Sequence, residues 1–259
     1  MGNTANDGMR SPEWYRPRIA YLSQFILPER FETFRQVLSM RTRWMTVCME
    51  NTFHPQNASA IIRNCEAFGI QDIHTVETLC PFSPNTHIVK GTDKWIDLHR
   101  HADTAGALAA LRRAGYRLIA TTPHSGDTSP EAFDVSQSPF VLIFGTEHAG
   151  ISDEVKAAAD GFIRIPMCGF VESLNVSASA AILLSQLSSR LRAGNAPWRL
   201  SDDEQAALAH PLGSGGVLCR EVIPEIHSLL PFSCFSSALP CGCSARGSSR
   251  PPRSPAQDR

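Results

Sequence analysis

Three segments of the chain gather charged or hydrogen-bonding side chains beside small residues. In the first segment, Asn57 stands at the expected start of a helix, and Arg63 follows six residues later. An arginine between Ile62 and Cys65 is costly to bury alone, so it needs a partner or extends to solvent. A guanidinium is planar and bidentate, which suits it to phosphate.

The second segment is the glycine-containing turn at residues 144–152. An apolar strand runs into Gly145, four residues separate it from Gly150, and Ser152 is placed to cap a helix. This spacing is close to that of a phosphate-binding loop, but Ile151 stands where such a loop needs lysine, which argues against a nucleotide hydrolase. The turn is either an ordinary connection or a place where a ligand meets the backbone beyond a strand's carboxyl end.

The third segment, residues 165–177, leads from a strand through Gly169 into a helix. Ser173, Asn175 and Ser177 place three hydrogen-bonding groups around one helix entrance. Helix caps alone could explain them, although capping needs fewer such groups. A run of Ser and Ala follows, and its small side chains permit close backbone packing.

Strands and helices alternate around these segments. Apolar, β-branched runs predict strands at residues 44–49, 73–76, 117–121, 140–144 and 162–165. Helices are expected at residues 57–68, 104–114 and 173–191, with a further one after Ser152. The alternation predicts an α/β fold, a parallel sheet with helices on both faces.

The two ends of the chain differ from this middle part. We expect residues 1–18 to be loose and a helix to begin near Pro28, where apolar residues recur at helical spacing between flanking arginines. Residues 211–259 contain nine Ser, seven Pro and five Gly, which predicts a disordered or non-native tail. The expected domains are an Arg-rich arm and helix at 1–43, a catalytic domain at 44–210, and the tail at 211–259.

Composition excludes some classes of protein. The formal net charge is −1, and arginine supplies most of the positive charge. No apolar run approaches the ~18–20 residues that cross a bilayer. No secretory signal is evident at the start. Four cysteines outside the tail stand singly in apolar or strand-like contexts and are interpreted as buried thiols: Cys48, Cys65, Cys80 and Cys168. No CxxC pair is present, so we expect a reduced, cytoplasmic, metal-free protein.

Taken together, the three segments resemble the SPOUT superfamily of RNA methyltransferases. Within it, they are similar to the tRNA (guanosine-18) ribose 2′-O-methyltransferase branch, the TrmH family. The patterns N-x-S-A-x-x-R, F-G-x-E-x-x-G-[IL]-S and I-P-M-x-G-x-x-x-S-[LF]-N-[VI]-S occur in that order at 57–63, 144–152 and 165–177. Residues 44–50 and 94–98 also look like this branch. Two departures stand out: Gln56 replaces a frequent His, and the tail lacks the usual final helix.

The resemblance implies a C-terminal deep trefoil knot, a homodimer, and S-adenosyl-L-methionine (SAM) as methyl donor. It carries SAM contacts over to Thr121, Gly145, Ile165 and Leu174. It assigns activation of a ribose 2′-hydroxyl to Arg63. Because a guanidinium stays protonated, we expect Arg63 to hold a phosphate and stabilise the developing alkoxide. The residues expected to position Arg63 and the ribose are Asn57, Glu147, Ser173 and Asn175.

The implied partner is tRNA, methylated at guanosine-18 in the D-loop. The candidate RNA contacts are arginines on either side of the core: Arg41, Arg43, Arg190, Arg192 and Arg199. Two alternatives stay open. One is a ribosomal RNA ribose methyltransferase, which the absence of an evident extra N-terminal RNA-binding domain disfavours. The other is an RNA-binding SPOUT protein with little or no activity, against which Arg63, Glu147 and Asn175 argue.

Overall fold

A parallel β-sheet forms the centre of the computed structural model. The model describes residues 12–52, 54–79, 81–85, 89, 92–123, 127–146 and 149–209. Glu147, Cys80 and the expected tail at 211–259 therefore lie outside the described residues. In the described part the sheet has six strands in the order β3-β2-β1-β5-β4-β6, and every pairing is parallel. The strands are β1 Met45–Glu50, β2 Asp72–Val76, β3 Asp97–His101, β4 Arg117–Thr121, β5 Phe140–Phe144 and β6 Gly161–Ile163.

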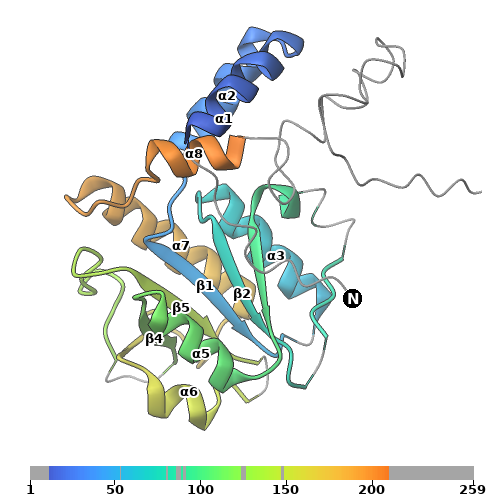
Figure 1. The fold of residues 1–259 in the computed structure, drawn as a ribbon. Helices are drawn as coiled ribbons and strands as arrows, with labels where there is room; N and C mark the ends of the chain where they lie inside the picture. Colours follow the sequence, from blue (N-terminus) through green and yellow to red (C-terminus); the bar gives the residue numbers. More distant parts are fainter. Residues whose placement is uncertain are drawn as a thin grey trace, which may run out of the picture. The chain divides into compact units, whose positions relative to one another are not determined.

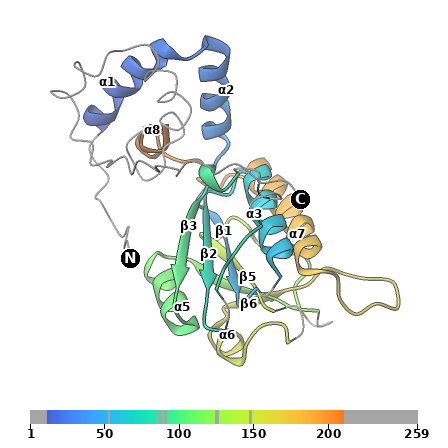
Figure 2. The same ribbon diagram turned by 90° about the vertical axis from the view of Figure 1, so that its right-hand side faces the viewer.

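Helices cover both faces of this sheet, as the alternation predicted (Figures 1 and 2). α3 (Pro55–Ala67) and α7 (Val176–Ala193) pack against each other on one face. α5 (Thr104–Arg113) and α6 (Asp153–Ala158) lie on the other. The central strands β1 and β5 are buried along their whole length, which explains their near-continuous apolar sequences.

The ends of the helices follow local sequence signals. Gly69 and Gly115 follow α3 and α5 with φ of +73° and +86°, a backbone region that favours glycine. Ser152 caps α6 by accepting a hydrogen bond from the Val155 amide. The expected helix start at 173 is wrong by three residues, because Asn175 accepts from the Ser177 amide and is the N-cap of α7.

The N-terminal region is more helical than the sequence indicated. α1 (Pro12–Leu22) occupies part of the stretch expected to be loose, and the short 3₁₀ helix η1 (Ser23–Phe25) follows it. Pro17 lies inside α1, where it removes one backbone donor. Contact with α8 (Asp202–Ala209) supports α1 in spite of that loss. α2 (Pro28–Ser39) begins where predicted and also contacts α8. A second 3₁₀ helix, η2 (Thr92–Trp95), precedes β3.

The cysteine prediction is partly confirmed. Cys48 and Cys65 are buried, and burial raises the pKa of the Cys48 thiol to about 12. Cys168 is exposed, because it lies in the connection between β6 and α7 rather than under a helix. Across the described residues, no helix combines the length and the apolar character that crossing a membrane would need.

Candidate active site

The first and third segments meet through a pair of asparagines. Asn57 lies in the first turn of α3 and is buried, while Asn175 precedes α7. Asn175 Nδ2 donates to Asn57 Oδ1 at 3.1 Å, and Asn175 Oδ1 accepts from the amide of Ser177 at 2.8 Å. Asn64, the residue after Arg63, donates from its Nδ2 to the Ser177 carbonyl at 3.1 Å. Two segments more than 100 residues apart are thus fixed side by side.

The second segment begins at the carboxyl end of the strand next to β1. β5 pairs with β1 in a register that sets Phe144 beside Met49, so the turn after β5 starts next to the chain that leads into α3. Thr146 and Gly150 close this turn with backbone hydrogen bonds of 2.9 and 3.1 Å. The distance from a Cβ on Gly145 to backbone atoms of Gly150 and Ile151 would be far below 3.0 Å. Position 145 therefore accepts only glycine without a shift of the backbone.

Arg63 is an exposed residue of α3. It is six residues beyond Asn57, or roughly 9 Å along the helix axis. Its neighbour Asn64 holds α3 against the start of α7, which fixes the part of the helix that carries the guanidinium. An exposed arginine beside a rigid contact can meet a large anionic substrate without first being uncovered.

Of the four residues expected to contact SAM, three lie at or just after the ends of strands, and the fourth lies shortly before α7. Thr121 ends β4, and its hydroxyl donates to the Ile143 carbonyl of β5 at 3.0 Å. Gly145 follows β5, and half-buried Ile165 comes two residues after β6. Leu174 is 39% exposed and lies next to Asn175, and Ser173 beside it is exposed. Because the strands are parallel, the three strand-end residues lie along the carboxyl edge of the sheet, where α/β folds bind ligands.

Two of the five arginines expected to contact RNA lie near the start of β1 and are bonded to other residues of the fold. Arg41 is 1% exposed, pairs with Glu66 at 3.0 Å and donates to the Ile70 carbonyl at 3.2 Å. Burial lowers the pKa of its guanidinium. Arg43 pairs with Asp72 and also reaches Asp97 and Glu204, at 2.7 and 3.5 Å. These contacts join the sheet to α8, so in this structure both guanidinium groups serve the fold.

Two more of the five are occupied near the end of α7. Arg190 donates to the carbonyls of Pro130 and, at 2.7 Å, Phe133. Arg192 donates to the carbonyls of Phe68 and Met40, at 2.6 and 3.2 Å. Arg199 is exposed, with its guanidinium 5.0 Å from the ring of Trp198. Of the five, Arg199 alone keeps an exposed position for RNA.

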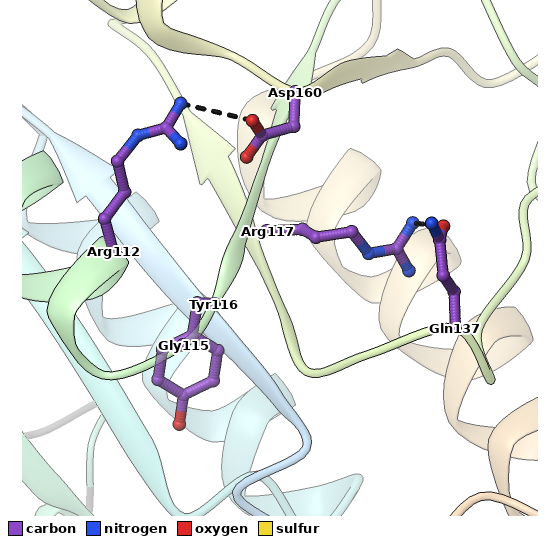
Figure 3. A pocket seen from close by; sticks show the side chains of 6 residues that line it. All are labelled: Arg112, Gly115, Tyr116, Arg117, Gln137 and Asp160. Carbon is purple, nitrogen blue, oxygen red and sulfur yellow. Dashed lines mark hydrogen bonds and ion pairs between the residues drawn. The ribbon is translucent and has the colours of Figure 1, made fainter.

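A hollow of about 420 Å³ lies at the opposite, amino edge of the sheet (Figure 3). Arg112 at the end of α5 pairs with Asp160 at 3.2 Å, and Arg117 at the start of β4 donates to Gln137 at 2.6 Å. The Tyr116 hydroxyl donates to the Arg43 carbonyl. Since none of the lining residues belongs to the three segments, the hollow is separate from the candidate site.

Sequence reasoning missed one residue beside the site, Glu50. It ends β1, is 2% exposed, and accepts hydrogen bonds from Ser152, the last residue of the second segment. The available signal was a single carboxylate after six consecutive apolar or β-branched residues of the strand expected at 44–49. A carboxylate is costly to bury unless several donors bind it.

Comparison with known proteins agrees with this geometry. Residues 45–185 match the SpoU rRNA Methylase family. A tRNA (guanosine(18)-2′-O)-methyltransferase of Borreliella burgdorferi is 35% identical over 191 residues, which cover 74% of this chain and 87% of that protein. The crystal structure of a TrmH/SpoU tRNA modifying enzyme from A. aeolicus matches with a TM-score of 0.58 and 25% identity, over 78% of this chain and 98% of that one. An AdoMet-bound rRNA methyltransferase from Sinorhizobium meliloti matches with a TM-score of 0.51 and 27% identity, over 61% and 60%. Matched across all three segments, the chain belongs to the SpoU methylase family.

Proposed function

We propose that this protein transfers a methyl group from SAM to a ribose 2′-hydroxyl of tRNA, at guanosine-18. The observation that carries the proposal is the 3.1 Å bond between Asn57 and Asn175, which joins the first and third segments beside the strand that leads into the second. The similarity to the tRNA (guanosine(18)-2′-O)-methyltransferase of Borreliella burgdorferi supports tRNA as the substrate class. The AdoMet-bound relative supports SAM as the donor.

The residues at the carboxyl edge fit a donor such as SAM. Ile165 and Leu174 offer apolar surface to a purine, and Gly145 brings backbone groups close without a side chain. Thr121 is held against β5, so the floor of the site is rigid. When bound, SAM supplies a methyl group on a positively charged sulfur. The chemistry proposed for the protein's own residues needs no metal ion.

Arg63 acts on the ribose side of the reaction. Its guanidinium binds a phosphate next to the target ribose and stabilises negative charge as it develops on the 2′-oxygen. A phosphate oxygen or a water molecule takes the proton. Asn57 and Asn175 fix α3 relative to α7, while Ser173 and Glu147 complete the positioning set. Alignment of the hydroxyl with the methyl group is the main source of rate.

We propose that the working enzyme is a homodimer with a knotted C-terminal part. The connection between β6 and α7 extends away from the sheet (Figure 2) and exposes Phe170, Val171 and Leu174. A second copy of this chain would cover such apolar side chains. The knot is what the resemblance to the SPOUT superfamily implies for this part of the chain.

We propose that tRNA is held by exposed arginines of the N-terminal arm together with Arg199. Arg30 and Arg35 lie on the exposed surface of α2, and Arg16 lies on α1. Arg41, Arg43, Arg190 and Arg192 are left out of this surface because they are bound within the fold. Phosphate contacts of this kind make binding strongly dependent on salt.

Incubation with labelled SAM and bulk tRNA tests the proposal. We expect label in tRNA, with the modified ribose mapped to guanosine-18. Label in ribosomal RNA but not in tRNA would replace this proposal by the ribosomal alternative. RNA binding without transfer to either substrate would identify an inactive RNA-binding protein. The expected place of action is the cytoplasm, where tRNA is available.

A further inference from the structure

Glu50 is a buried carboxylate with an unusual set of partners. It ends β1, and the chain turns at the next residue, Asn51, whose φ is +49°. Glu50 Oε1 accepts from the hydroxyls of Ser152 and Thr104, at 2.7 and 2.9 Å. Its Oε2 accepts from the backbone amide of Ser152 at 3.0 Å. Neutral donors thus supply all three of these hydrogen bonds.

These bonds tie three elements to one point. Thr104 is the first residue of α5, and Ser152 is the N-cap of α6, where its hydroxyl also accepts from the Val155 amide at 3.2 Å. The carboxylate is an acceptor only, and it suits this place because two hydroxyls and an N–H all donate toward it. A buried group with three charge-assisted hydrogen bonds holds its neighbours in one arrangement.

The turn of the second segment lies between two fixed ends. Its first end is Gly145, at the end of β5, and β5 is paired with β1. Its second end is Ser152, which Glu50 of β1 holds through both its amide and its hydroxyl. Contacts with β1, the same central strand, therefore hold both ends of the turn. A shift of Ser152 moves the Gly145–Gly150 contact, which has no spare space.

We infer that Glu50 is a positioning residue that sets the turn of residues 145–150 in the geometry needed to bind SAM. The inference rests on the proposed function, since it assumes that this turn contacts the donor. Glu50 acts through Ser152 and touches neither SAM nor RNA. Loss of its carboxylate frees the far end of the turn while the strand pairing of β1 with β5 remains.

Three variants test this inference in the full chain. Glu50→Ala removes all three hydrogen bonds, and Ser152→Ala removes the hydroxyl contact at the turn. Thr104→Val is the matched control, because it removes one hydrogen bond to the same carboxylate from an element outside the turn. For each protein, calorimetry gives the Kd for SAM and thermal unfolding gives Tm.

We expect all three variants to lower Tm. The Kd for SAM should rise by roughly 10-fold or more in Glu50→Ala and measurably in Ser152→Ala, and should not change in Thr104→Val, because small displacements of a positioned site have large effects. Glu50→Gln keeps the shape of the side chain and can direct its oxygen to the Ser152 amide. It should therefore recover most of the SAM affinity, and it serves as the test variant if Glu50→Ala does not fold.

The outcomes separate this inference from the proposed function. Wild-type protein that does not bind SAM would refute the proposed function. Wild-type protein that binds SAM, together with folded Glu50→Ala protein of unchanged Kd, would overturn the role of Glu50 and leave the proposed function standing. Equal loss of affinity in Thr104→Val would also overturn it, since the effect would then be general destabilisation. If Glu50→Ala does not fold, Glu50→Gln should bind SAM within about 3-fold of wild type while Ser152→Ala binds SAM more weakly. Equal Kd values for Ser152→Ala and wild type would then overturn the inference.

Discussion

A single added carbon at Gly145 should damage the site more than the fold. An ideal Cβ there would lie well under 3.0 Å from the carbonyl carbon and oxygen of Gly150 and from the amide nitrogen of Ile151. All three are backbone atoms, so no side chain can rotate to make room. The turn must move by roughly 1 Å to restore ordinary contact distances, and overpacking of this kind costs ~1–3 kcal/mol.

Gly145→Ala should therefore remain folded with Tm lowered by roughly 2–10 °C. A displacement of this size at a positioned turn should weaken SAM binding by ~10-fold or more and lower kcat/KM by up to ~10²-fold. Gly161→Ala is the matched control, since its Cβ would meet Ile119 at an ordinary 3.5 Å. Calorimetric titration with SAM and circular dichroism melting measure the two effects. Folded Gly145→Ala protein that binds SAM within about 2-fold of wild type would show that the turn at Gly145 does not shape the donor site.

Three further predictions concern Arg63, the asparagine pair and pH. Arg63→Ala should lower turnover by ~10²-fold or more while the Kd for SAM stays constant; an equal loss of SAM affinity would make the residue structural. Alanine replacements of Asn57 and Asn175, singly and together, should show a coupling of ~1 kcal/mol in urea unfolding, whereas additive losses would mean that their hydrogen bond adds nothing. Burial is the main cause, and the charge of His99 the second, that lowers the pKa of His74 to about 3. The unfolded chain, with a His pKa near 6.5, then binds the proton more readily than the folded chain does. Acidification from pH 7 to pH 5 should therefore lower the free energy of unfolding of wild type by ~2 kcal/mol more than that of His74→Asn. A hydrogen bond to a carboxylate raises the pKa of His99, so protonation of His99 stabilises the folded state in both proteins. Equal slopes of unfolding free energy against pH in the two proteins would contradict a lowered pKa of His74.

Elements with strong local signals could be predicted from the sequence. β5 is five consecutive apolar residues and is buried throughout, and α3 ends before a glycine with positive φ. β3 could not be predicted in this way. It is the strand Asp97–His101 at the edge of the sheet, and its mostly polar side chains are partly or fully exposed. An edge strand needs little apolar surface, so it lacks the pattern that marks a central one.

The site was predictable in outline but not in its supporting contacts. The three segments could be expected to converge, because parallel strands bring their carboxyl ends to one edge. The partners of the arginines could not, because they lie far away in sequence. Arg41 meets Glu66 and Arg190 meets the Phe133 carbonyl, contacts that join separate elements of the fold. The charge of a segment is the same whether its arginines bond to groups within the fold or face RNA.

A crystal structure of the full chain with S-adenosylhomocysteine bound would show directly where the donor site lies. Ligand density is expected at the carboxyl edge of the sheet, against the turn at Gly145 and next to Ile165 and Leu174, with Arg63 facing the open side. Density elsewhere, such as in the hollow between Arg112 and Arg117 at the amino edge, would contradict this expectation.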